Sequence, residues 1–565
     1  MKKFIPAIIA IALILIVVAG SFGMKLKEKY SYSDEQQNLS EYYDLLAAAD
    51  SRSVAVVLQN ERIPNWAKLI DGRCYMELRD VQALLNERFY HDENEGLLIY
   101  TTPTQKIIHV VGSNAYSVDG SEQAVDYSIT VQEGESLYLA LDYVKLYTNF
   151  SYELFSEPNR MQLRTEWGSR DSATISKDTH VRVKGGIKSP ILRAVEEGEV
   201  VTVLETMETW SKVKTNDVMI GYVENKFLEG HMTEDEIPVT DYAEPEYTSI
   251  HRDYKINLGW HAIYSEAGND TFESAVDGTG TMNVISPTWF FLDGSEGDIQ
   301  AIPSKAYVEK AHARNMEVWA LLENISLECN THEVLSYTSK REKLINTLMS
   351  YLLEYDIDGI NVDFESLSGE TGEHFTQFLR ELSIACRLNG IVLSVDNYVP
   401  RESNTFYNRK EQGVVADYVI IMGYDEHWGG GGVAGSVASI GYVQEGIEKT
   451  LKDVPAEKII NALPFYTRVW KTNGGEVTSE ALGMEAAAEF ISKYDVPTVW
   501  DEETCQNYGE IQMGDTFYQV WLEDERSIET KLTVMKNLNV GGVAAWQLGL
   551  EDKDIWDVID LFVKG

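Results

Sequence analysis

The chain contains, from residue 358 to 365, the sequence Asp358-Gly359-Ile360-Asn361-Val362-Asp363-Phe364-Glu365. Successive side chains of a β-strand point to opposite faces, so Asn361, Asp363 and Glu365 share one face. The opposite face is apolar and can pack against helices. Burying three polar side chains is costly unless they bind one another or a ligand, and this predicts a functional site at the end of the strand.

This strand is one of eight apolar runs that alternate with amphipathic segments between about residues 253 and 565. The predicted strands are 255–263, 282–286, 316–322, 358–364, 391–396, 417–424, 458–464 and 541–547. Eight strand–helix units predict an α/β fold, a (β/α)8 TIM barrel, whose chemistry sits at the carboxyl ends of the strands. The alternative is an open doubly wound sheet, which the count of eight and the missing glycine fingerprint disfavour.

Helices are expected between the strands, at 304–315, 340–355, 372–389 and 526–538. Ser339-Lys340-Arg341-Glu342 has the spacing of a capping box, in which a Ser side chain and a Glu three residues later satisfy each other's backbone N–H groups. We therefore expect the second of these helices to begin there.

Two carboxyl groups face the predicted barrel mouth. The Cα atoms of Asp363 and Glu365 should lie roughly 7 Å apart, at about 3.3 Å per residue. Like charges this close raise the pKa of one carboxyl group, as a general acid requires near neutral pH. A solvated strand end and a metal site are the alternatives, but apolar neighbours oppose the first. No HxxE or HxH pattern supplies further ligands for the second, so we expect no metal and no cofactor.

The same residues resemble the DGxDxDxE signature of family 18 glycoside hydrolases, with Asn361 in the first of the two inner Asp positions. That departure leaves the acid intact but weakens the expectation that Asp363 shuttles between two acidic partners. Three later segments also resemble the family, in the expected order: Met422-Gly423-Tyr424-Asp425 its MxYD motif, residues 463–470 its strand-seven segment, and residues 541–546 its strand eight, which ends in a sugar-stacking Trp.

The resemblance implies retaining, substrate-assisted cleavage of a β-linked N-acetylglucosamine unit. Glu365 would protonate the leaving oxygen and then activate water. Asp363 would hold the substrate's acetamido N–H, and Tyr424 would bond the acetamido oxygen, which acts as the nucleophile. Such enzymes depart from the usual two-carboxylate scheme.

The resemblance also implies substrate-binding positions. Trp546 would form the apolar floor under the sugar, Asp425 would bind a hydroxyl, and Asn361 would brace Asp363. Met422 would pack in the site wall. Trp546 and Tyr424 have a plainer interpretation as core residues. The four-glycine run at 429–432 lacks the Lys that follows in a phosphate-binding loop and is interpreted as a lid.

Composition limits the class of protein. Apolar residues make up 44% and charged residues 24%, which is too apolar for a disordered chain. The net charge of −42 opposes nucleic acid and anionic lipid as main partners. The four cysteines are far apart, so we expect isolated thiols rather than a zinc ribbon or a disulfide scaffold.

The chain starts with Met1-Lys2-Lys3 and an apolar run over residues 4–20. A basic start and an apolar run predict export, with residues 1–23 acting as an uncleaved membrane anchor or a removed signal peptide. The polar residues 24–50 are expected to be a linker. Residues 231–252, which are acidic and include Pro238, are expected to be a second linker before the barrel at 253–565.

Two smaller domains are predicted between these linkers. Residues 51–166 show a faint internal repeat at an offset of 63 residues, with Cys74–Asn86 and Leu137–Asn149 as its copies. This α+β segment resembles the copper amine oxidase N-terminal-like domain of bacterial surface proteins, with no metal function implied. Residues 172–230 carry short strands and turns and resemble a bacterial Src-homology-3-like β-barrel, which is either a cell-wall contact or a spacer.

These inferences predict an exported glycosidase acting on N-acetylglucosamine-containing polymer. Peptidoglycan is favoured over chitin because the accessory modules suggest a cell-wall address, and because the strand pattern and residues 520–524 resemble the spore-cortex and cell-wall branch of the family more than chitinases. The other hypotheses are a chitinase, a non-catalytic carbohydrate-binding surface protein, and a wall-anchored scaffold. The presence of Glu365 argues against the second, since family members that act as lectins have lost the acid.

Overall fold

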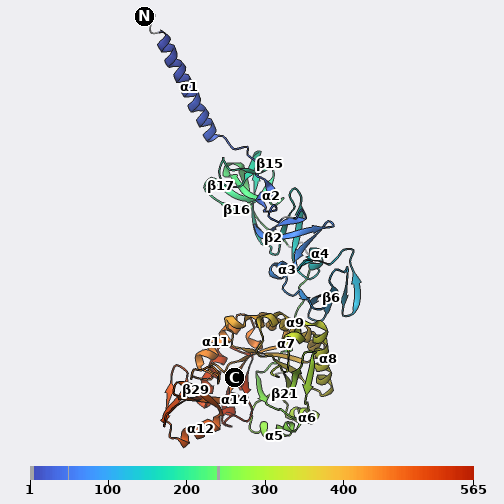
Figure 1. Cartoon of the computed structure of the whole chain (residues 1–565), viewed down its shortest axis with the longest axis vertical. Helices are drawn as coiled ribbons and strands as arrows, with labels where there is room; N and C mark the ends of the chain where they lie inside the picture. The colour runs from blue at the N-terminus through green and yellow to red at the C-terminus, as the bar shows by residue number, and fades with distance from the viewer. Residues whose placement is uncertain (1–4, 49, 238–241, 327) are drawn as a thin grey trace. The chain divides into compact units, whose positions relative to one another are not determined.

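The computed structural model describes residues 5–48, 50–237, 242–326 and 328–565 (Figure 1). The basic start at Met1-Lys2-Lys3 and Pro238 lie outside the described residues. The contacts group the chain into two compact units. One holds Met1–Phe89, Val110–Tyr116 and Gln123–Glu244, and the other holds Tyr90–His109, Ser117–Glu122 and Pro245–Gly565.

The second unit contains the barrel, and the predicted (β/α)8 fold is confirmed. Eight parallel strands follow one another around a sheet that closes where the first pairs with the second. They are β20 (Ile256–His261), β21 (Val284–Asp293), β23 (Glu317–Glu323), β24 (Gly359–Asp363), β25 (Val392–Tyr398), β26 (Tyr418–Met422), β27 (Ile459–Pro464) and β33 (Gly542–Trp546). The short strand β22 (Asp298–Ala301) pairs antiparallel with the long end of β21.

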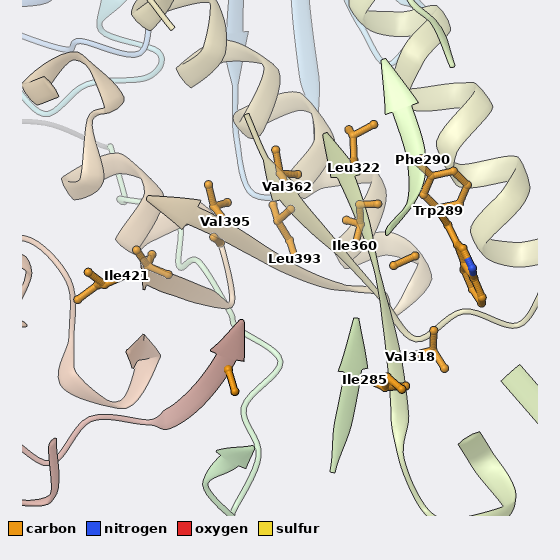
Figure 2. Close-up of a cluster of buried hydrophobic side chains, with 14 of the residues drawn as sticks. Ile285, Trp289, Phe290, Val318, Leu322, Ile360, Val362, Leu393, Val395 and Ile421 are labelled. Carbon is orange, nitrogen blue, oxygen red and sulfur yellow. The ribbon is translucent and has the colours of Figure 1, made fainter. Parts of the chain in front are cut away.

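The two faces of each barrel strand have different neighbours, as the period of two predicts. Ile360 and Val362 of β24 are fully buried in the layer between strands and helices, with Leu393 and Val395 of β25 (Figure 2). The barrel interior is a separate apolar cluster that includes Trp260, Trp319 and Tyr418. The inner face of β24 therefore carries its polar side chains above a packed floor.

Helices surround the barrel strands (Figure 1). They are α5 (Phe272–Ala275), α6 (Lys305–Ala313), α7 (Thr331–Ser336), α8 (Thr338–Glu354), α9 (Gly369–Asn389), α10 (Arg409–Val415), α11 (Ile440–Thr450), α13 (Glu525–Asn537) and α14 (Ile555–Lys564), with 3-10 turns at Glu266–Thr271, Glu402–Tyr407 and Ala456–Lys458.

The capping box expected at Ser339 does not form. Helix α8 begins one residue earlier, at Thr338, and no side chain of its own N-cap bonds to it. Asp92 instead accepts from the backbone N–H and the hydroxyl of Thr338, both at 2.6 Å, and Glu95 accepts from the Ser339 N–H. The free N–H groups at the start of this helix are bonded by carboxylates far away in the sequence. The local spacing of residues could therefore not predict this capping.

A five-stranded antiparallel sheet that we did not predict follows β27. It consists of β28 (Tyr466–Asn473), β29 (Glu476–Gly483), β30 (Thr498–Asp501), β31 (Gln506–Met513) and β32 (Thr516–Leu522), with α12 (Met484–Lys493) beside it. A buried ion pair between Glu523 and Lys531, at 2.8 Å, joins the end of this insertion to helix α13.

In the first unit, the small β-barrel predicted for residues 172–230 is present as a seven-stranded sheet. Its strands are β13 (Ser169–Ile175), β14 (Thr179–Arg182), β15 (Ile191–Val195), β16 (Val200–Thr206), β17 (Trp210–Lys214), β18 (Ile220–Glu224) and β19 (Leu228–Asp235), with a 3-10 turn at Asn225–Phe227. Val181, Val201 and Val213 form its core.

The segment predicted as α+β has mixed strands and short helices. One sheet holds β1 (Ser53–Leu58), β2 (Glu61–Ile70), β3 (Arg73–Glu77), β9 (Thr130–Glu133), β10 (Ser136–Ala140), β11 (Ser151–Phe155) and β12 (Arg160–Arg164). The two repeat copies are strand–helix pairs, β3 with α3 (Leu78–Leu84) and β10 with α4 (Leu141–Val144), and β3 pairs antiparallel with β10. The other strands are β4 (Tyr90–Asp92), β5 (Leu97–Thr101), β6 (Lys106–Val110), β7 (Ala115–Val118) and β8 (Ser121–Ala124).

The N-terminal helix α1 (Ile5–Tyr30) is long and apolar enough over Ile8–Tyr30 to cross a membrane. Part of the predicted 24–50 linker is ordered, because Tyr43 near its end is buried. The short helix α2 (Leu39–Tyr42) precedes Tyr43, which is 1% exposed and whose hydroxyl donates to the backbone oxygen of Val218.

Candidate active site

A cavity of about 280 Å³ opens at the carboxyl ends of the barrel strands. Side chains from six strands and the loops after them line it: Trp260, Tyr264, Glu323, Ile325, Asp363, Glu365, Asp396, Tyr398, Met422, Tyr424, Asp425 and Trp546. Five of these side chains are carboxylic acids, and the lining contains no Lys, Arg or His. The cavity can therefore take a sugar-sized ligand, and its polar groups suit one that donates hydrogen bonds.

Three of the acids form a row across adjacent strands. The parallel register pairs Glu323 of β23 with Asp363 of β24. On the other side it pairs Val362 with Val395, so the next positions along, Asp363 and Asp396, are also neighbours. Adjacent strands lie about 4.8 Å apart. Asp363 thus stands between two other carboxyl groups on the inner face.

Glu365 lies at the next level toward the mouth and is held from two sides. The Tyr398 hydroxyl donates to its Oε2 at 2.5 Å. Asn324, which directly follows β23, accepts from the Glu365 backbone N–H at 2.8 Å and donates to its backbone oxygen at 3.0 Å. Both the carboxyl group and the backbone of Glu365 are therefore fixed, while its side chain still reaches the cavity.

The pKa values of the three acids in this row are all raised. Burial, and then the charge of Asp396, raises the pKa of Asp363 well above its usual range, and burial raises the pKa of Asp396 likewise. Burial and the neighbouring Glu365 raise the pKa of Glu323 to about 7. Oδ1 of Asp363 is buried without a hydrogen-bond partner among the described residues. The site therefore holds protons near neutral pH, as closely spaced buried acids must.

Asn361 does not contact the cavity, which differs from the predicted substrate-binding role. It is fully buried below the row, where its Oδ1 accepts from the Trp260 indole at 2.8 Å and its Nδ2 donates to Asp396 at 2.8 Å. The same Oδ1 also accepts a hydrogen bond from the Ser286 hydroxyl at 3.3 Å. The side chain therefore braces Asp396 of the neighbouring strand, where we expected it to brace Asp363.

The other predicted residues line the cavity. Burial raises the pKa of Tyr424 well above its usual range, so its hydroxyl remains a donor. The ring of Trp546 meets Trp260 edge to face, with centroids 5.9 Å apart. Met422 lies in the wall, and Asp425 is oriented by the Tyr466 hydroxyl, which donates to it at 2.7 Å.

Sequence reasoning missed Glu323, Asp396 and Tyr398. The alternation that singled out β24 also places Asp396 and Tyr398 on one face of β25, so the same period of two could have found them. Glu323 ends β23 in the same way. The contact between Tyr398 and Glu365 had no local signal, because it joins residues on different strands.

Within the described ranges, no group of three His, Cys, Asp or Glu side chains is arranged to hold a metal ion. The four cysteines are free, and Cys74 and Cys386 are buried.

Comparison with known protein families identifies two parts of the chain. Residues 310–551, which include β24, β25 and β26 with their acids, match the model of glycosyl hydrolases family 18. The barrel is a family 18 glycosyl hydrolase domain. Residues 177–229 match the bacterial SH3 domain, which confirms the Src-homology-3-like interpretation. The resemblance of residues 51–166 to the copper amine oxidase N-terminal-like domain stays a prediction.

Relatives of the family 18 domain include a cortical fragment-lytic enzyme of Bacillus anthracis, 29% identical over 240 residues, which are 40% of this chain and 55% of that protein. A predicted sporulation-specific glycosylase of Bacillus subtilis is 31% identical over 227 residues, which are 39% and 53% of the two chains. The chain thus spans about half the length of these relatives. The C-terminal domain of a predicted chitinase from Desulfitobacterium hafniense has the same fold, with a TM-score of 0.50 and 19% identity over 55% of this chain and 100% of that one.

Proposed function

We propose that this protein is a retaining β-N-acetylglucosaminidase of cell-wall glycan, with Glu365 as its general acid and base. The observation that carries this proposal is the placement of Glu365, which the Tyr398 hydroxyl holds at 2.5 Å in a sugar-sized cavity above the buried Asp363. A fixed acid beside a second carboxyl group is the arrangement that glycosidic cleavage requires.

In this reaction Glu365 donates its proton to the leaving glycosidic oxygen. The substrate's own acetamido oxygen attacks the anomeric carbon, and Asp363 accepts the acetamido N–H and stabilises the positive charge that develops. The Tyr424 hydroxyl donates to the acetamido oxygen and holds it in line. Glu365 then takes a proton from water, which opens the cyclic intermediate with retention. Acid catalysis contributes about 10² to 10⁴-fold to the rate enhancement, and positioning contributes the rest.

The charge of the cavity favours a neutral sugar at the bond that breaks. Its five acids and lack of a basic side chain oppose a sugar that carries a carboxylate, because an uncompensated buried charge is costly. N-acetylmuramic acid has such a group and N-acetylglucosamine does not. We therefore place N-acetylglucosamine on the deep side of the cleaved bond, with muramic acid outside the cavity.

The names of the relatives and the domain next to the barrel favour peptidoglycan over chitin as the substrate. Two of the relatives are named for the spore cortex or for sporulation, and this chain adds a bacterial SH3 domain. The helix over Ile8–Tyr30 supports work outside the cytoplasmic membrane, either tethered or released. The SH3-like domain would contact the wall polymer or space the barrel from the membrane.

Digestion of purified peptidoglycan and of chitin oligomers, followed by mass spectrometry of new reducing ends, tests the proposal. We expect new reducing ends on N-acetylglucosamine in the peptidoglycan digest. Release from chitin alone would overturn the choice of peptidoglycan, and new reducing ends on muramic acid would overturn the assignment of the deep sugar.

A further inference from the structure

Asn361 stands where the family signature has an acid, which leaves Asp363 without a second carboxyl group on its own strand. The structure places another one beside it. Asp396 extends from the neighbouring strand β25 at the position next to Asp363, is 2% exposed, and lines the same cavity. A buried carboxyl group needs a function or a partner, because its burial destabilises the fold.

The hydrogen bonds around the pair leave room for one proton. Oδ1 of Asp396 accepts from Asn361 Nδ2 at 2.8 Å, which favours a charged Asp396. Oδ1 of Asp363 is buried and receives no hydrogen bond within the described part of the chain. Two adjacent buried carboxyl groups cannot both ionise cheaply, so one proton between them satisfies the orphaned oxygen.

We propose that Asp396 is the proton partner of Asp363, a positioning residue that takes on strand β25 the place left by Asn361 on strand β24. This rests on the proposed function. When the acetamido group of the substrate arrives, the proton leaves an Asp363 oxygen and passes to Asp396. The pair keeps a single negative charge, which then resides on Asp363 and faces the cationic intermediate.

Other titratable groups also face Asp363 and Asp396, and one of them could hold the proton instead. Glu323 flanks Asp363 from β23, and Glu365 lies above it just after the end of β24. Tyr398 approaches from β25, and Tyr424 from the loop after β26. Glu323 is the rival proton partner, because it lies at the same level on the other side. It has no hydrogen bond to any described residue comparable to the one between Asn361 and Asp396, and it is partly exposed.

Exchanging the amide at position 361 with the acid at position 396 tests this proposal most sharply. Asp396→Asn leaves two facing amides, Asn361→Asp leaves two facing acids, and the double variant restores one acid and one amide with their positions exchanged. We expect Asp396→Asn to lower kcat at least ~10-fold with KM within ~3-fold, to move a limb of the pH–rate profile, and the double variant to recover most of both. Asp417→Asn is the matched control, because Asp417 is buried at the other end of the barrel, where its carboxyl group accepts two backbone N–H groups.

Infrared difference spectra of 13C-aspartate-labelled protein give a reading that needs no turnover. The parent should show a protonated aspartic acid near neutral pH, Asp396→Asn should lose it, and the double variant should regain it. An unchanged protonated band and pH profile in Asp396→Asn, or the same changes caused by Glu323→Gln instead, would overturn the proposal. If Asp396→Asn fails to fold, the double variant against Asn361→Asp makes the same comparison. A parent without turnover would overturn the proposed function, and the infrared result would still decide the proton partner.

Discussion

At the scale of single residues, the hydroxyl of Tyr398 is the contact that fixes the acid. We expect Tyr398→Phe to lower kcat/KM by about 2- to 10-fold, since the net contribution of a hydrogen bond is about 0.5–1.5 kcal/mol. Steady-state kinetics on a soluble glycan and thermal unfolding measure the two effects separately. Full activity in a folded Tyr398→Phe would contradict the assigned contact.

Glu323 gives the site a dependence on pH. Its pKa is raised to about 7 by burial and by Glu365. The unfolded carboxyl group titrates near its ordinary value of about 4.3, so its contribution to stability is complete below that pH and is lost as the pH rises through 7.

Glu323→Gln removes this loss. The shift corresponds to an upper bound of about 4 kcal/mol, and screening of a partly exposed group reduces it to roughly 1–2 kcal/mol. Urea unfolding of the barrel at pH 5 and pH 8 should show the variant gaining on the parent at the higher pH. An equal difference at both values would show that Glu323 does not titrate in this range.

At the scale of elements, Asp92 is the N-terminal cap of α8. Asp92→Ala leaves the buried N–H and hydroxyl of Thr338 without their acceptor, and we expect a loss of about 1–2 kcal/mol in the free energy of unfolding. Glu93→Ala is the matched control, because its side chain is 84% exposed. Urea titrations of both variants check this, and equal effects of the two would contradict the cap.

Periodicity predicted the eight barrel strands but not the contacts that join the elements. The period of two placed Asp363 and Glu365 on one face, toward the barrel mouth. Applied to β25, the same period would have placed Asp396 and Tyr398 on the inner face of that strand. The capping of α8 and the contact of Asn361 with Asp396 could not be read in the same way, because both join residues far apart in the chain. The insertion at β28–β32 was missed because its strands are partly exposed and lack a long apolar run.

At the scale of the whole molecule, the net charge of −42 would repel an insoluble, anionic cell-wall glycan, which is the substrate proposed above. Repulsion between like charges slows association, and salt screens it, with a Debye length of about 10 Å at 0.1 M. We expect hydrolysis of intact wall to speed up by a few-fold as salt rises from about 0.01 to 0.15 M. Rates on a neutral chitin oligomer are the control and should stay level. A fall in the wall rate with salt would show that attraction through a local basic surface dominates.

The central claim is that the carboxyl group of Glu365 protonates the bond that breaks. Turnover and glycan binding of Glu365→Gln, measured beside the parent, test this most directly, because the amide keeps the size of the side chain and cannot donate the proton. We predict a loss of turnover of about 10³-fold or more with Kd within about threefold of the parent. Cleavage by Glu365→Gln at the parent's rate would contradict the account.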